Sequence, residues 1–276
     1  MQRRFQLVDV FHSGPFSGNP VAVVLDSEGL TTEDMQRITR WFNLSETTFL
    51  LPPETPDADY RVRIFTLDRE LPFAGHPTLG SAHAWRLAAG SDQAELMQQC
   101  GVGLVNVRFD GSRPAFAAPP LIRSGPVDDA QIADIIEVLR IGRDQISAEW
   151  ADNGPGWILV QLTSAEAVLA VDPLRYLDRR VEIGLVGAHP AGHDTAFEIR
   201  ALFSDASGGI IEDPVTGSLN ASVAQCLLAD GRATAPYVAA QGTKLGRAGR
   251  IHVSEADGDI WIGGETRTLF SGTGNF

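Results

Sequence analysis

The sequence predicts an α+β protein built from two similar halves. Short strand-like segments alternate with turns that draw on 28 glycines and 16 prolines, and only a few segments have helical periodicity. One helix motif also occurs twice along the chain. Because most connections between the expected strands are short, we expect largely antiparallel neighbours rather than a doubly wound parallel sheet. A length of 276 residues suits two domains.

The first half of the chain contains two expected helices among its strands. Thr31 stands before Glu33 and Asp34, which predicts a capped helix over residues 31–42. A second helix is expected over Pro77–Ala89 and ends at Gly90. Strand-like patterns predict strands at residues 7–11, 21–25, 47–51, 60–66, 103–109 and 114–117.

The second half repeats this mixture after a proline-rich break at residues 118–120, where we place the domain boundary. We expect an N-terminal domain of residues 1–118, completed by 266–276, and a C-terminal domain of residues 119–265. Helices are predicted over residues 130–139 and 217–230, the second ended by Gly231. Strands are predicted at residues 157–161, 168–171, 181–187, 196–203, 250–253 and 260–263.

The repeated motif is GHPTLGSAHA, from Gly75, and EDPVTGSLNA, from Glu212. Aligning the two pairs His76 with Asp213, so that each copy has a polar residue at the expected N-cap and proline at the first helical position. Both helices are rich in alanine and leucine with few charges, which predicts one buried central helix in each domain. Such N-termini suit a small carboxylate held between the domains; the alternative is two ordinary capped core helices.

Acidic residues outnumber basic ones, with 35 Asp and Glu against 22 Lys and Arg and a formal net charge of −13. This charge disfavours nucleic acids and anionic membrane surfaces as partners. No apolar stretch approaches the ~20 residues of a membrane span and no leader-like apolar segment follows Met1, so we expect a cytoplasmic protein. Cys100 and Cys226 form neither a disulfide framework nor a zinc motif, and both are expected in the core.

Five motifs in chain order resemble the phenazine-biosynthesis PhzF-like family: FSGNPVAVV, NLSET, PFAGHPTLGSA, EDPVTGS and QGTKLGRAGRI. The resemblance implies a diaminopimelate epimerase-like fold of two pseudo-symmetric domains, each a curved antiparallel sheet or barrel around a central helix, with the cleft between them. It also implies a homodimer that isomerises an acid of the trans-2,3-dihydro-3-hydroxyanthranilate type without a metal or organic cofactor.

The resemblance further implies the residues of the site. Glu46, from NLSET, is the expected acid/base, and His76 and Asp213 are expected to act with it. The expected substrate-binding residues are Gly75, Ser218, Asn19 and Gly217.

Glu46 also has a structural interpretation. Asn43 and Glu46 have the spacing of a helix-capping box, but the residues that follow are strand-like, which favours a catalytic carboxylate with a raised pKa. The motifs that correspond to the paired thiols of epimerases with this fold contain no cysteine, which excludes a two-thiol mechanism.

Two other groups of polar residues are less specific. His189 and His193 have the spacing of metal ligands on a helix, but an intervening proline and glycine predict a loop. Lys244, Arg247 and Arg250 either cover an acidic surface or contact a dimer partner.

The sequence therefore predicts a cofactor-independent isomerase that moves a proton, and with it a double bond, in a small carboxylic acid. A lyase or dehydratase acting on a related acid and a non-catalytic metabolite-binding protein stay open as alternatives.

Overall fold

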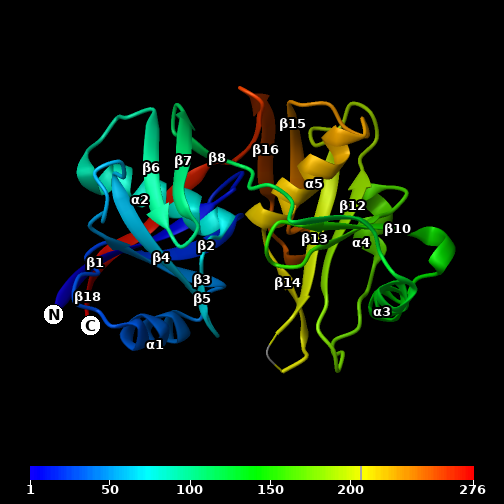
Figure 1. Ribbon diagram of the computed structural model, residues 1–276, viewed down its shortest axis with the longest axis horizontal. Coiled ribbons are helices and arrows are strands. Elements are labelled where there is room, and N and C mark those ends of the chain that lie inside the picture. Colours follow the sequence, from blue (N-terminus) through cyan, green and yellow to red (C-terminus); the bar gives the residue numbers. More distant parts are fainter. Residues whose placement is uncertain (206) are drawn as a thin grey trace. The chain divides into compact units, whose positions relative to one another are not determined.

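The computed structural model describes residues 1–205 and 207–276, and the chain divides into two compact units. Unit 1 comprises Met1–Ala117 with Gly263–Phe276, and unit 2 comprises Ala118–Ile262. Both units mix strands and helices, as Figure 1 shows, so the predicted α+β class is confirmed.

Unit 1 is a mostly antiparallel sheet with two helices. Its hydrogen-bonded order is β18-β1-β2-β3-β4-β6-β7-β8, with β5 beside the end of β4. The strands are β1 (Gln2–Val10), β2 (Asn19–Val24), β3 (Glu46–Leu51), β4 (Tyr60–Thr66), β5 (Glu70–Leu71), β6 (Glu95–Cys100), β7 (Gly103–Asp110), β8 (Arg113–Ala117) and β18 (Thr266–Asn275). The helices are α1 (Thr32–Phe42) and α2 (Gly75–Ala89).

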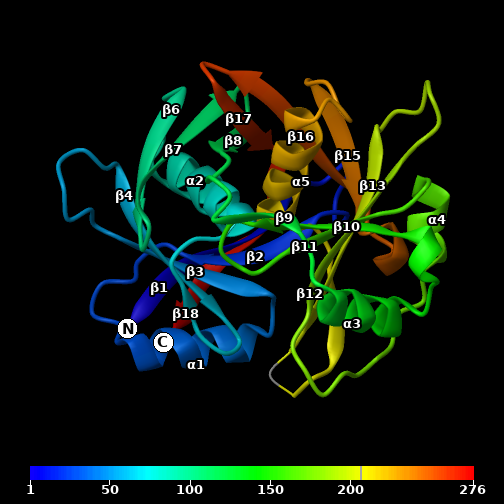
Figure 2. The ribbon, with the colours of Figure 1, turned by 45° about the vertical axis from the view of Figure 1, so that its right-hand side comes forward.

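Helix α2 lies against strands on several sides, including β1, β2, β3, β8 and β18 (Figure 2). Its first ten residues contain no exposed side chain, which explains why it has no single apolar stripe. Gly80 permits this packing, because a Cβ atom there would lie 2.4 Å from Cγ1 of Val21. Successive side chains of a strand point to opposite faces of the sheet, and α1 packs against a different set of them from α2. Met35 of α1 packs with Phe49 and Phe65.

In unit 2 the sheet has the strand order β9-β10-β11-β12-β13-β15-β16, with β14 also paired to β13. The strands are β9 (Arg123–Pro126), β10 (Ser147–Asp152), β11 (Ile158–Gln161), β12 (Glu182–Ala188), β13 (Phe197–Ser204), β14 (Ile210–Asp213), β15 (Tyr237–Gln241), β16 (Gly249–Ala256) and β17 (Asp259–Gly263), which ends at the unit boundary. The helices are α3 (Asp129–Leu139), α4 (Ala165–Ala170) and α5 (Gly217–Ala229), with short 3-10 turns at Arg143–Gln145 and Thr243–Leu245.

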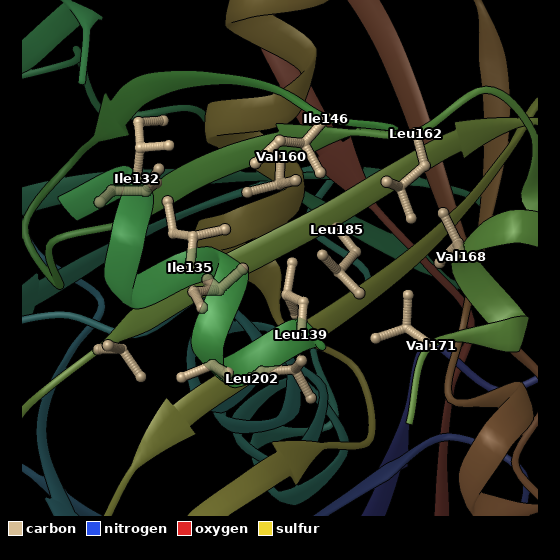
Figure 3. Packing of buried hydrophobic residues seen from close by; sticks show 14 of the residues in the cluster. Ile132, Ile135, Leu139, Ile146, Val160, Leu162, Val168, Val171, Leu185 and Leu202 are labelled. Carbon is tan, nitrogen blue, oxygen red and sulfur yellow. The ribbon is translucent and has the colours of Figure 1, made fainter. Parts of the chain in front are cut away.

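Helix α5 packs on one face of this sheet, against β10, β12 and β16. Its Leu219 fits over Gly184, where a Cβ atom would lie 2.2 Å from Cδ1 of the leucine. Helices α3 and α4 pack against the strand side chains that point to the opposite face of the sheet from α5. Figure 3 shows their apolar contact, in which Ile135 and Leu139 of α3 lie among strand residues such as Leu185.

The parallel strand pairs have one cause in both units. The pairs β2–β3 and β4–β6 in unit 1 each enclose a helix in sequence, α1 and α2 respectively. The pairs β11–β12 and β13–β15 in unit 2 enclose α4 and α5 in the same way. Parallel neighbours require a long crossover, which a helix provides. The remaining pairs are antiparallel, and most of them are joined by short connections, although β9 and β10 flank α3 and β1 pairs with the distant β18. The internal repeat is therefore one of topology as well as of motif.

Two sequence predictions are wrong in detail. The strand expected at residues 168–171 is the end of α4, which begins after a cap in which the Ser164 side chain accepts from the Ala167 amide. A short apolar run does not distinguish a strand from a buried helix. The predicted N-caps are also misplaced, because α2 begins at Gly75 and α5 begins at Gly217, so that neither His76 nor Asp213 is a cap.

Candidate active site

Unit 1 brings together Glu46 and His76. Glu46 is the first residue of β3, and His76 is the second residue of α2. The Oε2 atom of Glu46 lies 3.5 Å from Nε2 of His76, and the two side chains are 16% and 4% exposed. A carboxylate and an imidazole therefore face each other in a largely water-excluded place.

The local sequence explains how Glu46 enters the strand. Asn43 ends α1 in the left-handed conformation, with φ at 55°, and its N–H bonds back to the Thr39 carbonyl. Glu46 then pairs with Thr66 at the start of the β3–β4 ladder. The capping-box interpretation of Asn43 and Glu46 is thus wrong, since Asn43 closes a helix and does not open one.

Asn19 contacts the other ring nitrogen of His76. Its Nδ2 atom is 3.4 Å from Nδ1 of His76, and the side chain is fully buried. The loop before it is held by Asp9, whose carboxylate accepts from the amides of Ser17 and Gly18 at 3.1 and 2.9 Å. Gly18 is required there, because a Cβ atom would lie 2.1 Å from the Val10 carbonyl oxygen.

Burial determines the charge of His76. It lowers the pKa of the ring from 6.5 to about 3, although a hydrogen bond with the Pro20 backbone acts in the opposite direction. His76 is therefore neutral at neutral pH, and its approach to Glu46 is a polar contact rather than an ion pair.

In unit 2, a glutamine organises the connection from β14 to α5. Asp213 is the last residue of β14, and its Oδ2 accepts from Oγ1 of Thr216 at 2.6 Å. The Gln241 amide donates to the Asp213 carbonyl at 3.1 Å and to Thr216 Oγ1 at 3.0 Å. Its oxygen accepts from the Thr216 amide at 3.0 Å and from Nδ2 of Asn220 at 2.8 Å. Asp213 is thereby held just before the central helix.

Ser218 stands in the first turn of α5, next to buried Gly217. Its Oγ accepts a hydrogen bond from Nε1 of Trp157 at 3.1 Å, and its carbonyl accepts from Nδ2 of Asn153 at 2.9 Å.

Neither central helix has a side-chain cap within the described residues. The first amides of α2 belong to Gly75 and His76, and those of α5 belong to Gly217, Ser218 and Leu219. Exposed to a ligand, such amides and the helix dipole favour an anion. Each unit therefore combines a carboxylate side chain with the uncapped N-terminus of a central helix.

The repeat and the family motifs singled out Glu46, His76, Asp213 and Ser218 as candidates. They missed Gln241 and Trp157, which act by hydrogen bonds to residues distant in the chain. In the sequence, only their positions could have pointed to these two residues. Gln241 is the first residue of the QGTKLGRAGRI motif, and Trp157 follows a glycine-rich turn.

The other groups singled out from the sequence lie elsewhere in unit 2. His189 and His193 are in a loop, as predicted, with their rings stacked 3.9 Å apart and Nε2 of His189 3.4 Å from Oε2 of Glu198. Lys244 is exposed, whereas Arg247 and Arg250 are half-buried. Across the described residues there is no cluster of three or more histidine, cysteine or acidic side chains able to hold a metal ion.

Both cysteines are unpaired thiols, Cys100 half-buried and Cys226 buried. Burial raises the pKa of each, that of Cys226 to about 11, so neither thiol is activated as a nucleophile. In the described part of the chain, no helix combines the length and the apolar character needed to cross a membrane.

A family model described as phenazine biosynthesis-like protein matches residues 8–273. The chain belongs to this family. The trans-2,3-dihydro-3-hydroxyanthranilate isomerase of Pseudomonas fluorescens is 34% identical, covering 88% of this chain and 87% of that protein. Antisense-enhancing sequence 1 of Schizosaccharomyces pombe is 31% identical over 98% of both chains.

Solved structures agree with this assignment. A predicted epimerase from Pseudomonas aeruginosa has a TM-score of 0.79 at 29% identity, covering 98% of both chains. A hydroxyproline epimerase from Agrobacterium vitis, with a TM-score of 0.60 at 12% identity over 99% of this chain and 92% of that one, shows a shared fold. The expected family, epimerase-like fold and isomerase class are confirmed.

Proposed function

We propose that this isomerase moves a proton, and with it a double bond, in a small carboxylic acid of the trans-2,3-dihydro-3-hydroxyanthranilate type, by acid/base catalysis that needs no cofactor. The observation that carries the proposal is the contact between the shielded Glu46 carboxylate and the neutral, buried His76. Relatives named for that reaction share about a third of the sequence over most of its length.

In the proposed reaction, Glu46 removes a proton from a carbon of the substrate. The C–H electron pair enters the conjugated system, the double bond moves, and the protonated Glu46 returns the proton to a different carbon. His76 touches the carboxylate and, being neutral, orients it without holding it as a permanent ion pair.

Binding of the substrate is assigned to the polar groups around the central helices. Gly75, Gly217 and Ser218 are proposed to donate hydrogen bonds to the substrate carboxylate or to the enolate that develops from it. Asp213 is proposed to take the amino or hydroxyl group, and Asn19 to position His76 and contact the substrate.

The test is the Glu46→Gln variant, which keeps the size of the side chain and removes the base. Proton transfer is measured by NMR as deuterium incorporation from D₂O into the trans-2,3-dihydro-3-hydroxyanthranilate probe. We expect a loss of about 10²- to 10⁴-fold, with unchanged thermal stability. The matched control is Glu28→Gln, an exposed glutamate of the same unit, which should exchange at the wild-type rate. Exchange by Glu46→Gln at that rate would show that another group is the base.

The same assay distinguishes the alternatives. A product lighter by one water would identify a lyase or dehydratase, because elimination follows the same proton removal. Thermal stabilisation by the probe without deuterium incorporation would identify a binding protein. We also propose that the protein is a homodimer, as the family resemblance implies, and size-exclusion chromatography with light scattering tests this.

A further inference from the structure

We propose that Trp157 is a positioning residue that orients the Ser218 hydroxyl as a hydrogen-bond donor, so that unit 2 selects ligand groups that accept hydrogen bonds over groups that donate them. This inference rests on the proposed function, since it concerns the same substrate site. It goes beyond that function by assigning the acceptor selectivity to an indole that the family motifs do not contain.

The contact between the two side chains has only one possible direction. An indole N–H donates and never accepts, so Nε1 of Trp157 gives its proton to Oγ of Ser218 across 3.1 Å. Trp157 is 4% exposed, and a buried indole N–H needs such a partner. Within the described residues, the hydroxyl of Ser218 donates to no protein acceptor. Its proton is therefore available to a ligand.

Accepting from the indole changes what the hydroxyl does next. Hydrogen bonds in a chain polarise one another, so an oxygen that accepts becomes a stronger donor and a weaker acceptor. The contact also occupies one lone pair, which restricts rotation of the hydroxyl. Ser218 thus presents a donor, suited to a carboxylate or enolate oxygen and poorly suited to an ammonium or amidinium group.

The surrounding loop is built to hold this geometry. Oδ1 of Asp152 accepts from the amides of Gly154 and Gly156, each at 2.7 Å, which closes the turn before β11. From that turn Asn153 donates to the Ser218 carbonyl at 2.9 Å, so one loop holds both the backbone and the side chain of Ser218.

Strand alternation explains why the indole reaches α5. Ile158 and Val160 belong to the core shared with α3 and α4, so their neighbour Trp157 points to the opposite face, where α5 lies. A phenylalanine there fills most of the same space but leaves the serine hydroxyl free to rotate and to accept.

Trp150 provides a matched control within the same unit. It is also buried, at 8% exposure, but it packs in the core with α3 and α4, and its Nε1 has no hydrogen-bond partner among the described residues. Trp150→Phe therefore removes an indole from unit 2 without removing a hydrogen bond, whereas Trp157→Phe removes the bond to Ser218.

The experiment measures binding of benzoate and benzamidine by calorimetry. These ligands have the same shape, but one head group accepts hydrogen bonds and the other donates them. We expect Trp157→Phe to bind benzoate about 2- to 13-fold more weakly than Trp150→Phe does, the range of one hydrogen bond, with benzamidine unchanged or bound more tightly. Ser218→Ala should show the same loss, and the double variant Trp157→Phe/Ser218→Ala should be no weaker than Ser218→Ala alone.

Three results would overturn the inference: equal benzoate affinity in the two tryptophan variants, additive losses in the double variant, or no benzoate binding by the wild type. Failure of the proposed function has a different signature. If no proton exchange occurs while the benzoate pattern holds, the site binds carboxylates through Trp157 and Ser218, and the assignment of catalysis is wrong.

Discussion

Acidification should destabilise the folded protein through His76. Burial holds the pKa of this ring at about 3, against 6.5 for an exposed histidine. Between those values the unfolded chain binds a proton that the folded protein does not, so stability falls as the pH falls. The loss begins near pH 6.5 and ends near the folded pKa of about 3.

The magnitude follows from the width of this window. Each pH unit well inside it costs about 1.4 kcal/mol, so lowering the pH from about 6.5 to about 4.5 costs about 2–3 kcal/mol from this ring alone. His83 has the same sign, because burial lowers its pKa to about 4. Its contribution is common to the wild type and to a His76 variant, and it cancels in their difference.

The assay is urea denaturation of the wild type and of His76→Asn across that pH range. The variant should be less stable near neutral pH, because it loses buried packing, but its stability should depend less on pH. The difference in unfolding free energy between the two proteins should therefore shrink by about 2–3 kcal/mol over these two pH units. The difference in unfolding free energy between the wild type and His83→Asn should also shrink as the pH falls, because burial lowers the pKa of His83 as well. A difference that stays constant with pH would refute the argument.

Two further predictions concern packing and buried charge. Arg200 makes a bidentate ion pair with Glu212, at 3.0 and 2.8 Å, and is 2% exposed, so Arg200→Met should destabilise unit 2 by about 3–5 kcal/mol. Urea denaturation should show recovery in Arg200→Met/Glu212→Leu; a single variant as stable as the wild type would contradict this. Gly80→Ala should cost about 1–3 kcal/mol through the clash with Val21, with partial rescue by Val21→Ala. A stable Gly80→Ala protein would show that α2 can shift.

Local patterns in the sequence determined several elements correctly. The Thr31 cap is present with Asp34 as its reciprocal partner, and the strands predicted at residues 103–109 and 114–117 form an antiparallel pair. Both central helices were recognised from their lack of charge. These signals are local because a cap, a turn or a buried helix depends on residues within a few positions of one another.

Several strands escaped sequence prediction for a physical reason. Strands β6 and β18 contain many polar or small residues, and they are strands because neighbouring strands pair with them. Glu95 of β6 pairs with Arg108 of β7, and Asn275 of β18 pairs with Gln2 of β1. The predicted start of α2 was also wrong, because the helix begins two residues earlier, at Gly75. Both Gly75 and His76 are buried. Tertiary packing overrides local preference at such positions.

The residues of the candidate site show the same division. The motifs by themselves made Glu46, His76 and Ser218 candidates, because each of these residues lies in a short run of sequence that resembles the family. Only the folded structure placed Glu46 3.5 Å from His76, made that histidine neutral by burial, and set Trp157 against Ser218. Those properties depend on strand register and on the exclusion of water, which arise from contacts between residues far apart in the chain.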